Sequence, residues 1–397
     1  MTRLYAGPVE LFDGTGPKPA RKRGVLIEEG RFAWVGAHAR APKEARQATV
    51  LDAEGAFLAP GLFDCHVHLC FDGEADFLAE GRVSEATAAI KASRNAERHL
   101  ASGITTVRDL GTMGSVAVDV GRAVEEGRVA GARVIASGRA LTITGGHGWN
   151  SFAEQVDGVE GFRSGVRRQV RAGARSIKVV ATGGVLTPGV TLDFVSLTDE
   201  ELTAAVEEAH RWNLPIAAHA HGEEGIVHAA RAGVDSIEHG SVASAATMRI
   251  LAERGTFHVP TFAAHAGIVG HPDEVAPYVL EKGRQIFEAA KTSFRNAVKA
   301  GVRHAVGTDA GTPFNRHGRT PDELVRMVET GLSPAGALLA ATSNAAALCR
   351  VDDRLGTIEP GKLADLVVYR EDPLQDVTAF TRPALVVKEG VLAVDAG

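Results

Sequence analysis

Short apolar runs alternate with longer amphipathic runs over most of this sequence, and no other feature restricts its fold as strongly. The apolar runs predict eight buried strands, at residues 61–69, 105–110, 133–137, 176–182, 215–221, 235–239, 256–262 and 304–309. Between them, patterns rich in Ala, Glu and Arg predict helices, for example at 84–101, 198–213, 225–232 and 276–300. Eight such parallel βα units predict an α/β fold with a (β/α)8 TIM barrel. A doubly wound sheet is the alternative, but the Gly-rich phosphate turn that it needs does not follow Leu69.

The two ends of the chain differ from this middle part. Residues 1–58 and 346–397 lack long helical patterns and contain short strand-like runs, such as 25–28, 32–35, 366–369 and 384–388. Two flanking segments of this kind do not each form a core, so we expect them to pair in one small β domain. The sequence therefore predicts a barrel over residues 59–345 and a flanking domain built from residues 1–58 and 346–397.

Composition excludes several classes of partner. The chain has 397 residues, a net charge of −6 at pH 7 and no basic stretch, which argues against nucleic acid and anionic membranes as partners. Its three cysteines form no CxxC pair and cannot make a disulfide framework, so we expect a cytoplasmic protein. Glu10 and Asp13 stand where a signal peptide needs an apolar core, so we expect no export signal. The longest uncharged run, residues 330–349, is too polar to span a bilayer. We therefore expect an enzyme that acts on a small molecule, and we expect it to form a homo-oligomer.

Charged or metal-binding types of side chain stand on five of the predicted strands, mostly at their carboxyl ends. They are His66 and His68, Lys178, His219 and His221, His239, and Asp309. His66 and His68 lie two residues apart on a strand and so share one face, which suits a single transition-metal ion. A lysine inside an apolar strand is costly unless it is paired, neutralised or modified, so Lys178 also requires an explanation. Agreement between five strands indicates a metal centre at one end of the barrel.

These residues together resemble the amidohydrolase superfamily. The HxH after the first strand, the lysine of the fourth, the histidines of the fifth and sixth and the GTD of the eighth follow that superfamily's pattern. The segments KVVATGG at 178–184, GGHG at 145–148 and AATSNAA at 340–346 are similar to those of a branch related to imidazolonepropionase. That branch contains binuclear Xaa-Pro dipeptidases and carboxypeptidases. Residues 355–366 (LGTIEPGKLADL) resemble the strand that returns to the family's small β-sandwich, so the resemblance implies that the flanking domain is a β-sandwich.

The resemblance also implies a ligand set and a reaction. Lys178 is then N-carboxylated and bridges two divalent metal ions, with zinc expected. His66, His68 and Asp309 hold one ion, and His219 and His239 hold the other. A hydroxide shared by the ions attacks an amide carbonyl, and the catalytic Asp309 passes its proton to the leaving nitrogen. The implied activity is amide hydrolysis, with dipeptides (Xaa-Pro or Xaa-hydrophobic) or N-acyl amino acids as substrates.

Three further histidines are candidates for substrate binding. His147 lies in a glycine-rich loop that we expect to be exposed and mobile, and the resemblance implies that it contacts a substrate carboxylate. His221 lies too far along its strand to share an ion with His219 comfortably, so it either hydrogen-bonds the substrate or has a structural role. After the eighth strand, His317 and its neighbours Asn315, Arg316 and Arg319 are alternative groups for binding an anion.

Other activities stay open at this stage. His221, followed three residues later by Glu224, matches the spacing of mononuclear deaminases, but those enzymes have no use for Lys178. Imidazolonepropionase also lacks that lysine ligand, and a metal-free structural relative would not keep every ligand position. Related sequences with similar ligands hydrolyse aryl amides, esters or organophosphates, so the sequence does not fix the substrate.

Overall fold

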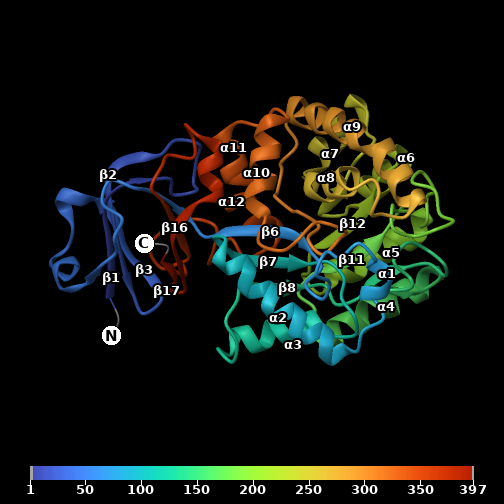
Figure 1. The fold of residues 1–397 in the computed structure, drawn as a ribbon, viewed down its shortest axis with the longest axis horizontal. Coiled ribbons are helices and arrows are strands. Elements are labelled where there is room, and N and C mark those ends of the chain that lie inside the picture. Colours follow the sequence, from blue (N-terminus) through green and yellow to red (C-terminus); the bar gives the residue numbers. More distant parts are fainter. Residues whose placement is uncertain (1–2, 396–397) are drawn as a thin grey trace.

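The computed structural model describes residues 3–395, and it has a mixed α/β fold with two regions (Figure 1). One region is a sheet with the strand order β17-β16-β15-β5-β1-β2-β3, in which β4 pairs with β1. Its strands are β1 (Arg3–Leu11), β2 (Ala20–Glu28), β3 (Arg31–Ala37), β4 (Thr49–Val50), β5 (Phe57–Pro60), β15 (Leu366–Tyr369), β16 (Pro383–Lys388) and β17 (Val391–Asp395). Because β15 pairs with β5, strands from both ends of the chain meet in this sheet. The exact limits of the two domains stay a prediction.

The other region contains two parallel sheets, which lie among the helices in Figure 1. One has the order β6-β7-β8 and the other β10-β9-β11-β12-β13-β14. Their strands are β6 (Leu62–Val67), β7 (Ile104–Asp109), β8 (Arg133–Ala136), β9 (Ala140–Thr142), β10 (Ala153–Gln155), β11 (Ile177–Val180), β12 (Ile216–Ala220), β13 (Ser236–His239) and β14 (Phe257–Val259). Seven of these correspond to predicted strands, which confirms the parallel α/β class.

The eighth predicted strand, residues 304–309, does not form a regular strand. Its backbone hydrogen bonds instead alternate between two neighbours: Val306 O accepts from Cys65 N at 2.8 Å, and Ala305 N donates to His258 O at 3.2 Å. A side chain at Gly307 would place its Cβ 2.8 Å from that of His66, so only glycine permits this close approach. The segment therefore lies between β6 and β14, although its ladder is too short to be a strand.

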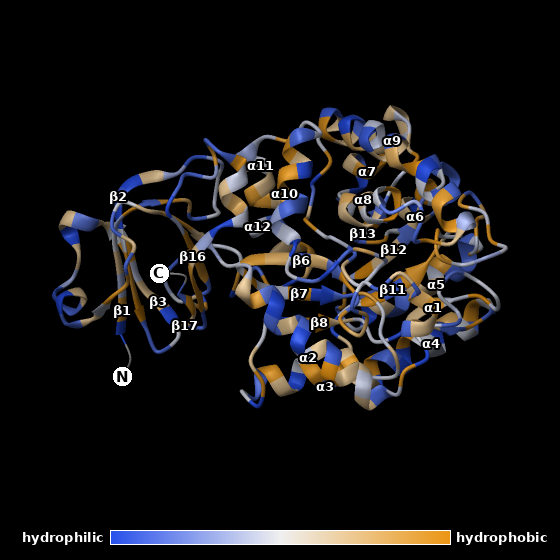
Figure 2. Cartoon of the chain, viewed as in Figure 1, coloured by the Kyte–Doolittle hydropathy of each residue, from blue (hydrophilic) through white to orange (hydrophobic). Residues whose placement is uncertain are grey.

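Helices connect the parallel strands. They are α1 (Phe77–Glu80), α2 (Glu85–Ala101), α3 (Val116–Glu125), α4 (Gly158–Ala172), α5 (Asp199–Arg211), α6 (Glu223–Ala232), α7 (Ala245–Arg254), α8 (Phe262–Gly270), α9 (Pro277–Ala300), α10 (Thr320–Glu329), α11 (Pro334–Ala340) and α12 (Ser343–Leu348). Short 3-10 helices cover His38–Arg40, Lys43–Gln47 and Val377–Thr381. The capping box of Thr198 and Glu201 fixes the start of α5. The helices carry both hydrophobic and hydrophilic residues, as expected for elements that pack one face on a core (Figure 2).

The alternation of side chains along the parallel strands separates the core from the site. On β11, Ile177 and Val179 pack in an apolar cluster with Leu202 of α5. Lys178 lies between them in sequence and faces the opposite side, where it lines a cavity. Among the described residues, none of the helices combines the length and the apolar character needed to cross a membrane.

Candidate active site

A cavity with a polar floor and an apolar wall opens at the carboxyl ends of the parallel strands. Its polar lining consists of His66, His68, His147, Lys178, His219, His221, His239, His265, Asp309 and Thr312. Its apolar lining consists of Phe77, Phe152, Val185, Leu186, Ala264 and Ile268. A concave site with a few convergent polar groups on an apolar background is typical of a small-molecule binding site.

The first group of potential metal ligands is His66, His68 and Asp309. Oδ1 of Asp309 lies 3.4 Å from Nε2 of His66 and 3.2 Å from Nε2 of His68. All three side chains are buried, and one ligand atom from each lies within 4.8 Å of the others. Burial lowers the pKa of His66 to about 4, which keeps the ring neutral and able to coordinate a metal.

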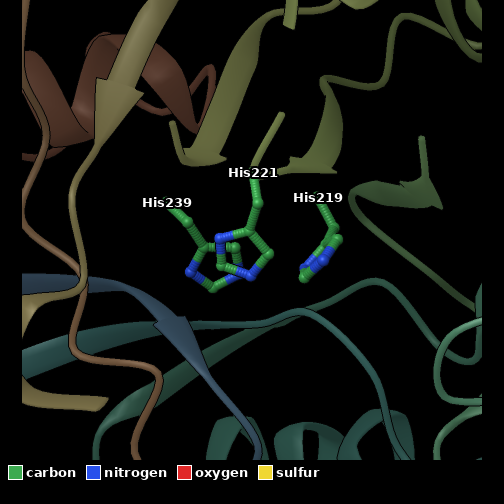
Figure 3. Close-up of side chains that lie close together, drawn as sticks. All are labelled: His219, His221 and His239. Carbon is green, nitrogen blue, oxygen red and sulfur yellow. The ribbon is translucent and has the colours of Figure 1, made fainter. Parts of the chain in front are cut away.

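The second group is His219, His221 and His239, whose rings point toward one another (Figure 3). The ring centroids lie 4.6 Å apart for His219 and His239, and 4.7 Å apart for His221 with either of the others. The sequence predicted that His221 stands apart from the ligand position of His219. The structure instead brings both rings together, because His221 is the first residue after β12 and turns toward the same point as His239.

Most of these histidines have one ring nitrogen held by the protein, so that the other nitrogen is free to face the cavity. Nδ1 of His68 donates to Gly111 O at 2.9 Å, and Nε2 of His219 donates to Gly183 O at 3.2 Å. The remaining contacts are Ser241 Oγ with Nδ1 of His221 at 2.8 Å and Thr261 Oγ1 with Nδ1 of His239 at 2.7 Å. Such outer contacts fix the tautomer and orientation of metal-binding imidazoles.

A buried ion pair supports His66, and sequence reasoning missed it. Nδ1 of His66 lies 2.9 Å from Oε2 of Glu238, and Arg108 donates to Oε1 of the same carboxylate at 2.8 Å. Burial alone would raise the pKa of Glu238, but Arg108 and His66 outweigh it, so the pKa lies below its ordinary value. A signal was present, because Arg108 and Glu238 are charged residues inside predicted buried strands.

Lys178 is buried without a partner. Its side chain is 2% exposed, and Nζ has no hydrogen-bond acceptor. Burial lowers the pKa of its amine to about 8, although Glu238 and Asp309 act in the opposite direction. An unpaired buried amine is unfavourable, so its surroundings suit a modified or ligand-bound lysine better than a free ammonium.

Two side chains of the site lie at strained points of the backbone. His239 has φ = 69° and Asp309 has φ = 59°, which is the left-handed region that residues other than glycine rarely adopt. This conformation breaks the alternation of a strand at its carboxyl end. Glu238 and the adjacent His239 consequently both contact groups of the site. Such strain is typical of functional positions held by their surroundings.

The remaining predicted residues differ in where they lie. His147 lines the cavity but is only 6% exposed, so the expected exposed setting is wrong; its Nδ1 lies 2.8 Å from Thr187 Oγ1 of the loop that follows β11. His317 is not brought to the cavity. Its Nε2 donates to Phe71 O at 2.8 Å and its Nδ1 lies 2.9 Å from Nε2 of His99, so both nitrogens serve internal contacts. The cavity also includes His265, for which the sequence offered no spacing signal.

Comparison with known proteins covers nearly the whole chain. The model of the amidohydrolase family matches residues 57–393. Ochratoxinase of Aspergillus niger is 32% identical over 417 aligned positions, which span 97% of this chain and 84% of that protein. A crystal structure of a Xaa-Pro dipeptidase with methionine bound in its active site gives a TM-score of 0.90 at 31% identity, over 98% of this chain and 99% of that one. A prolidase complexed with N-methylphosphonate-L-proline gives a TM-score of 0.91 at 30% identity, over 98% and 99% of the two chains.

Proposed function

The chain belongs to the amidohydrolase family and is a hydrolase of amide bonds, and we propose that it works with two divalent metal ions, zinc being the expected metal. One observation carries the proposal: two groups of three metal-capable side chains lie side by side in a buried cavity, with Lys178 beside both. Rings of the two groups are adjacent, since the centroids of His66 and His239 lie 5.2 Å apart. Lys178 also interacts electrostatically with both of these histidines.

The donor set fits divalent ions of the zinc type. Neutral imidazoles and carboxylates are common zinc ligands, and the outer contacts of the histidines leave the inward nitrogens available. His66, His68 and Asp309 would hold one ion, and His219 and His239 the other, with His221 beside them as a further ligand or substrate donor. When bound, such a pair of ions supplies a water-derived nucleophile at neutral pH and polarises the carbonyl that is attacked.

N-carboxylation of Lys178 resolves the unfavourable burial of its amine. In this reaction the neutral Nζ forms a bond to the carbon of CO2 and releases one proton, which gives a carbamate whose single negative charge is shared by its two oxygens. Because burial lowers the pKa of Nζ, more of the amine is neutral and reactive at neutral pH than in an exposed lysine. The resulting anion faces both groups of ligands and replaces a charge that repels metals with one that binds them.

Asp309 is the proposed proton carrier. Burial alone would raise the pKa of its carboxyl, but the neighbouring His66, His68 and Lys178 outweigh it, so the carboxylate is ionised at neutral pH. Its side chain lines the cavity within reach of a bound amide. An Asp309 oxygen can therefore accept a proton from the attacking water and donate it to the leaving nitrogen.

The lining of the cavity supports small amides with a hydrophobic half. We propose dipeptides of the Xaa-Pro or Xaa-hydrophobic type, or N-acyl amino acids, as substrates. His147 is the proposed receiver of a substrate carboxylate. Arg316, His317 and Arg319 line a separate hollow rather than this cavity, so we do not assign them this role.

One observation favours a second candidate, an aryl-amide or ester hydrolase. Among the described residues that line the cavity, Lys178 is the sole lysine or arginine, and with Lys178 carboxylated a substrate carboxylate finds no permanently cationic side chain there. If substrates with an amidated carboxyl group react as fast as the free acids, the second candidate is correct. A mononuclear deaminase is disfavoured, because Glu224 is 73% exposed and its carboxylate faces His228 on the outside of α6.

The two parallel sheets and residues 304–310 fit a closed (β/α)8 barrel, and we propose this closure together with a β-sandwich arrangement of the flanking sheet. Hydrogen bonds from residues 304–310 to both β6 and β14 support the closure. The limits 59–345 for the barrel and 1–58 with 346–397 for the flanking domain belong to the same proposal. The homo-oligomeric state and the cytoplasmic location stay predictions.

Metal content per chain, measured together with peptide hydrolysis, tests the proposed function. Two ions support the binuclear hydrolase, one ion a deaminase or imidazolonepropionase, and none a metal-free relative. We expect Lys178→Ala to lose metal and turnover, with partial recovery in added short carboxylic acids that fill the vacated anionic position. His271→Ala is the matched control, because His271 stacks on Phe314 outside the cavity at a centroid distance of 3.9 Å. Full metal content and turnover in Lys178→Ala would rule out the bridging role.

A further inference from the structure

His265 is the one histidine among the described cavity residues with neither ring nitrogen in contact with a protein group. Its side chain is 2% exposed, and both Nδ1 and Nε2 lack a hydrogen-bond partner. His66, His68, His147, His219, His221 and His239 each have one nitrogen within 3.2 Å of a protein oxygen. A buried imidazole without a protein partner for either nitrogen is unfavourable unless another group binds it, so it requires another explanation.

The position of His265 argues against a role as a metal ligand. Its ring centroid lies 6.1 Å from that of His221 and 6.2 Å from that of His239, whereas the rings of the second ligand group lie 4.6 to 4.7 Å apart. It belongs to neither group of converging ligand atoms. His265 therefore stands beside the ligands, where the polar floor meets the apolar wall.

The helix that carries His265 is firmly held. Both carboxylate oxygens of Glu323 accept hydrogen bonds from the first turn of α8, from Phe262 N and Ala263 N, each at 2.7 Å. Ala264 and Ile268, on the same helix, belong to the apolar lining of the cavity. The imidazole is therefore a polar group on a rigid, mainly apolar surface, which is an arrangement suited to recognition.

The surroundings of His265 indicate what kind of group it can bind. No carboxylate or other protein group pairs with either ring nitrogen, so the buried imidazole is free to offer one donor and one acceptor. A substrate charge placed there would lose its water next to apolar side chains without gaining a counter-charge. An uncharged group that both donates and accepts, such as a hydroxyl or a carboxamide, matches the ring on both counts.

We propose that His265 is a specificity-determining residue that hydrogen-bonds a hydroxyl or carboxamide on the hydrophobic half of the substrate. The inference rests on the proposed function, because the amide must lie over the ligand groups for its side chain to reach α8. The proposal adds a substrate preference that the metal-ligand groups alone do not predict. Among hydrophobic amides of equal size, those with one uncharged polar group facing His265 bind better.

Dipeptides that differ by a single polar group test the proposal. Each probe pair differs at one residue: Leu is compared with its near-isostere Asn, and Phe is compared with Tyr. Both pairs are made at each position of the dipeptide, and kcat/KM is measured for every member. At the position that faces α8, we expect the ratio of the polar to the apolar member to fall about fivefold to tenfold in His265→Leu relative to the unsubstituted enzyme, as for the loss of one neutral hydrogen bond. His265→Gln, which keeps a donor and an acceptor, should restore part of the ratio.

Val269→Ala is the matched control on the same helix, because Val269 does not line the cavity and its truncation leaves the polar group in place. Its polar-to-apolar ratio should stay within about twofold of the unsubstituted value. Calorimetry gives dissociation constants of the same peptides for the chelator-treated protein, so the ratio is also obtained without turnover. This second measurement remains usable if a variant binds metal poorly. An unchanged ratio in His265→Leu, in both measurements and at both positions, overturns the proposal. Absence of peptide hydrolysis by the unsubstituted, metal-loaded enzyme instead overturns the proposed function.

Discussion

The mixed sheet built from both chain ends and the parallel sheets that carry the cavity differ in what they bury. The core of the mixed sheet consists of apolar side chains, among them Leu4, Val25, Leu58, Leu366 and Val387. The parallel sheets also have apolar cores, but their strands bury a lysine, a glutamate and an arginine as well, namely Lys178, Glu238 and Arg108. Buried charges of this kind add little net stability even when they are paired. The difference indicates that the parallel sheets carry the site at the expense of stability.

The backbone shows the same contrast. In the mixed sheet, Glu29 and Glu389 adopt positive φ at exposed hairpin turns, each followed by a glycine with positive φ, as two-residue turns between antiparallel strands require. At the site, His239, Thr261 and Asp309 adopt positive φ at buried positions. Positive φ values therefore reverse the chain in the mixed sheet, whereas at the site they place side chains in the cavity. We expect substitutions in the two regions to affect different quantities.

Asp309→Asn should give the largest effect and act on turnover far more than on stability. The amide keeps the size of the side chain and leaves an oxygen for a metal, but it cannot accept and return a proton. We expect kcat to fall about 10²- to 10⁴-fold, and further if metal binding weakens. The melting temperature of the metal-free protein should change little, since this carboxylate has no role in a packed core. Steady-state kinetics, metal analysis and thermal unfolding check the three parts, and near-normal kcat would remove Asp309 from the mechanism.

Leu366→Ala should give the opposite result. Leu366 is fully buried in β15, and its truncation leaves a cavity in the mixed sheet, which we expect to lower the free energy of unfolding by about 2–5 kcal/mol. Per folded molecule, kcat and KM should not change, because β15 contributes nothing to the cavity lining. Chemical denaturation and kinetics below the transition measure both.

The control for this prediction lies in the same sheet. Leu392 of β17 is 41% exposed, so Leu392→Ala should change stability by less than about 1 kcal/mol. A loss of kcat in Leu366→Ala at unchanged stability would show that the two regions are coupled, and the contrast between them would then fail.

The contrast between regular and irregular backbone also explains which features of the site the sequence predicted. The period of two along strands predicted that His66 and His68 share a face, and the structure gathers them with Asp309. Periodicity failed where the backbone leaves regular geometry: residues 304–309 form no regular strand, and His221 joins His239 beyond the point where the strand pattern ends. His147 is buried in contact with Thr187, forty positions away in a loop, and no local pattern encodes such a contact.

The charged residues inside the predicted strands carried a further signal about the site. Arg108 and Glu238 belong to strands 130 residues apart in sequence, so only the arrangement of the sheets shows that they pair beneath His66. His317 illustrates the reverse error. Its place after the eighth predicted strand suggested a substrate contact, but His99, far away in sequence, occupies one of its nitrogens. Position along a strand predicts which face a side chain takes, and it does not predict which partners are already there.

The loop between β11 and α5 provides the smallest and most specific test, because it supplies Val185 and Leu186 to the cavity wall. Nζ of Lys282, on α9, donates to three carbonyl oxygens of this loop: Gly184 at 3.1 Å, Thr187 at 2.8 Å and Val190 at 2.6 Å. The Thr187 hydroxyl in turn contacts His147. An ammonium with all three of its donors on one loop acts as a clamp for that loop. Lys282 is thus a positioning residue for the cavity wall.

Lys282→Met keeps the length of the side chain and removes the three donors. The loop supplies Val185 and Leu186 to the cavity, and once released it must be ordered again each time a substrate binds. We therefore expect KM to rise about tenfold, which corresponds to ~1.4 kcal/mol, with kcat within about threefold of its original value and little change in melting temperature. Amide hydrogen exchange should increase in residues 183–195. Lys291→Met on the same helix is the control, since Lys291 pairs with the exposed Glu288 and should change neither quantity. If Lys282→Met leaves both KM and loop exchange unchanged, the wall is held by its own packing, and the site region is then as self-supporting as the mixed sheet.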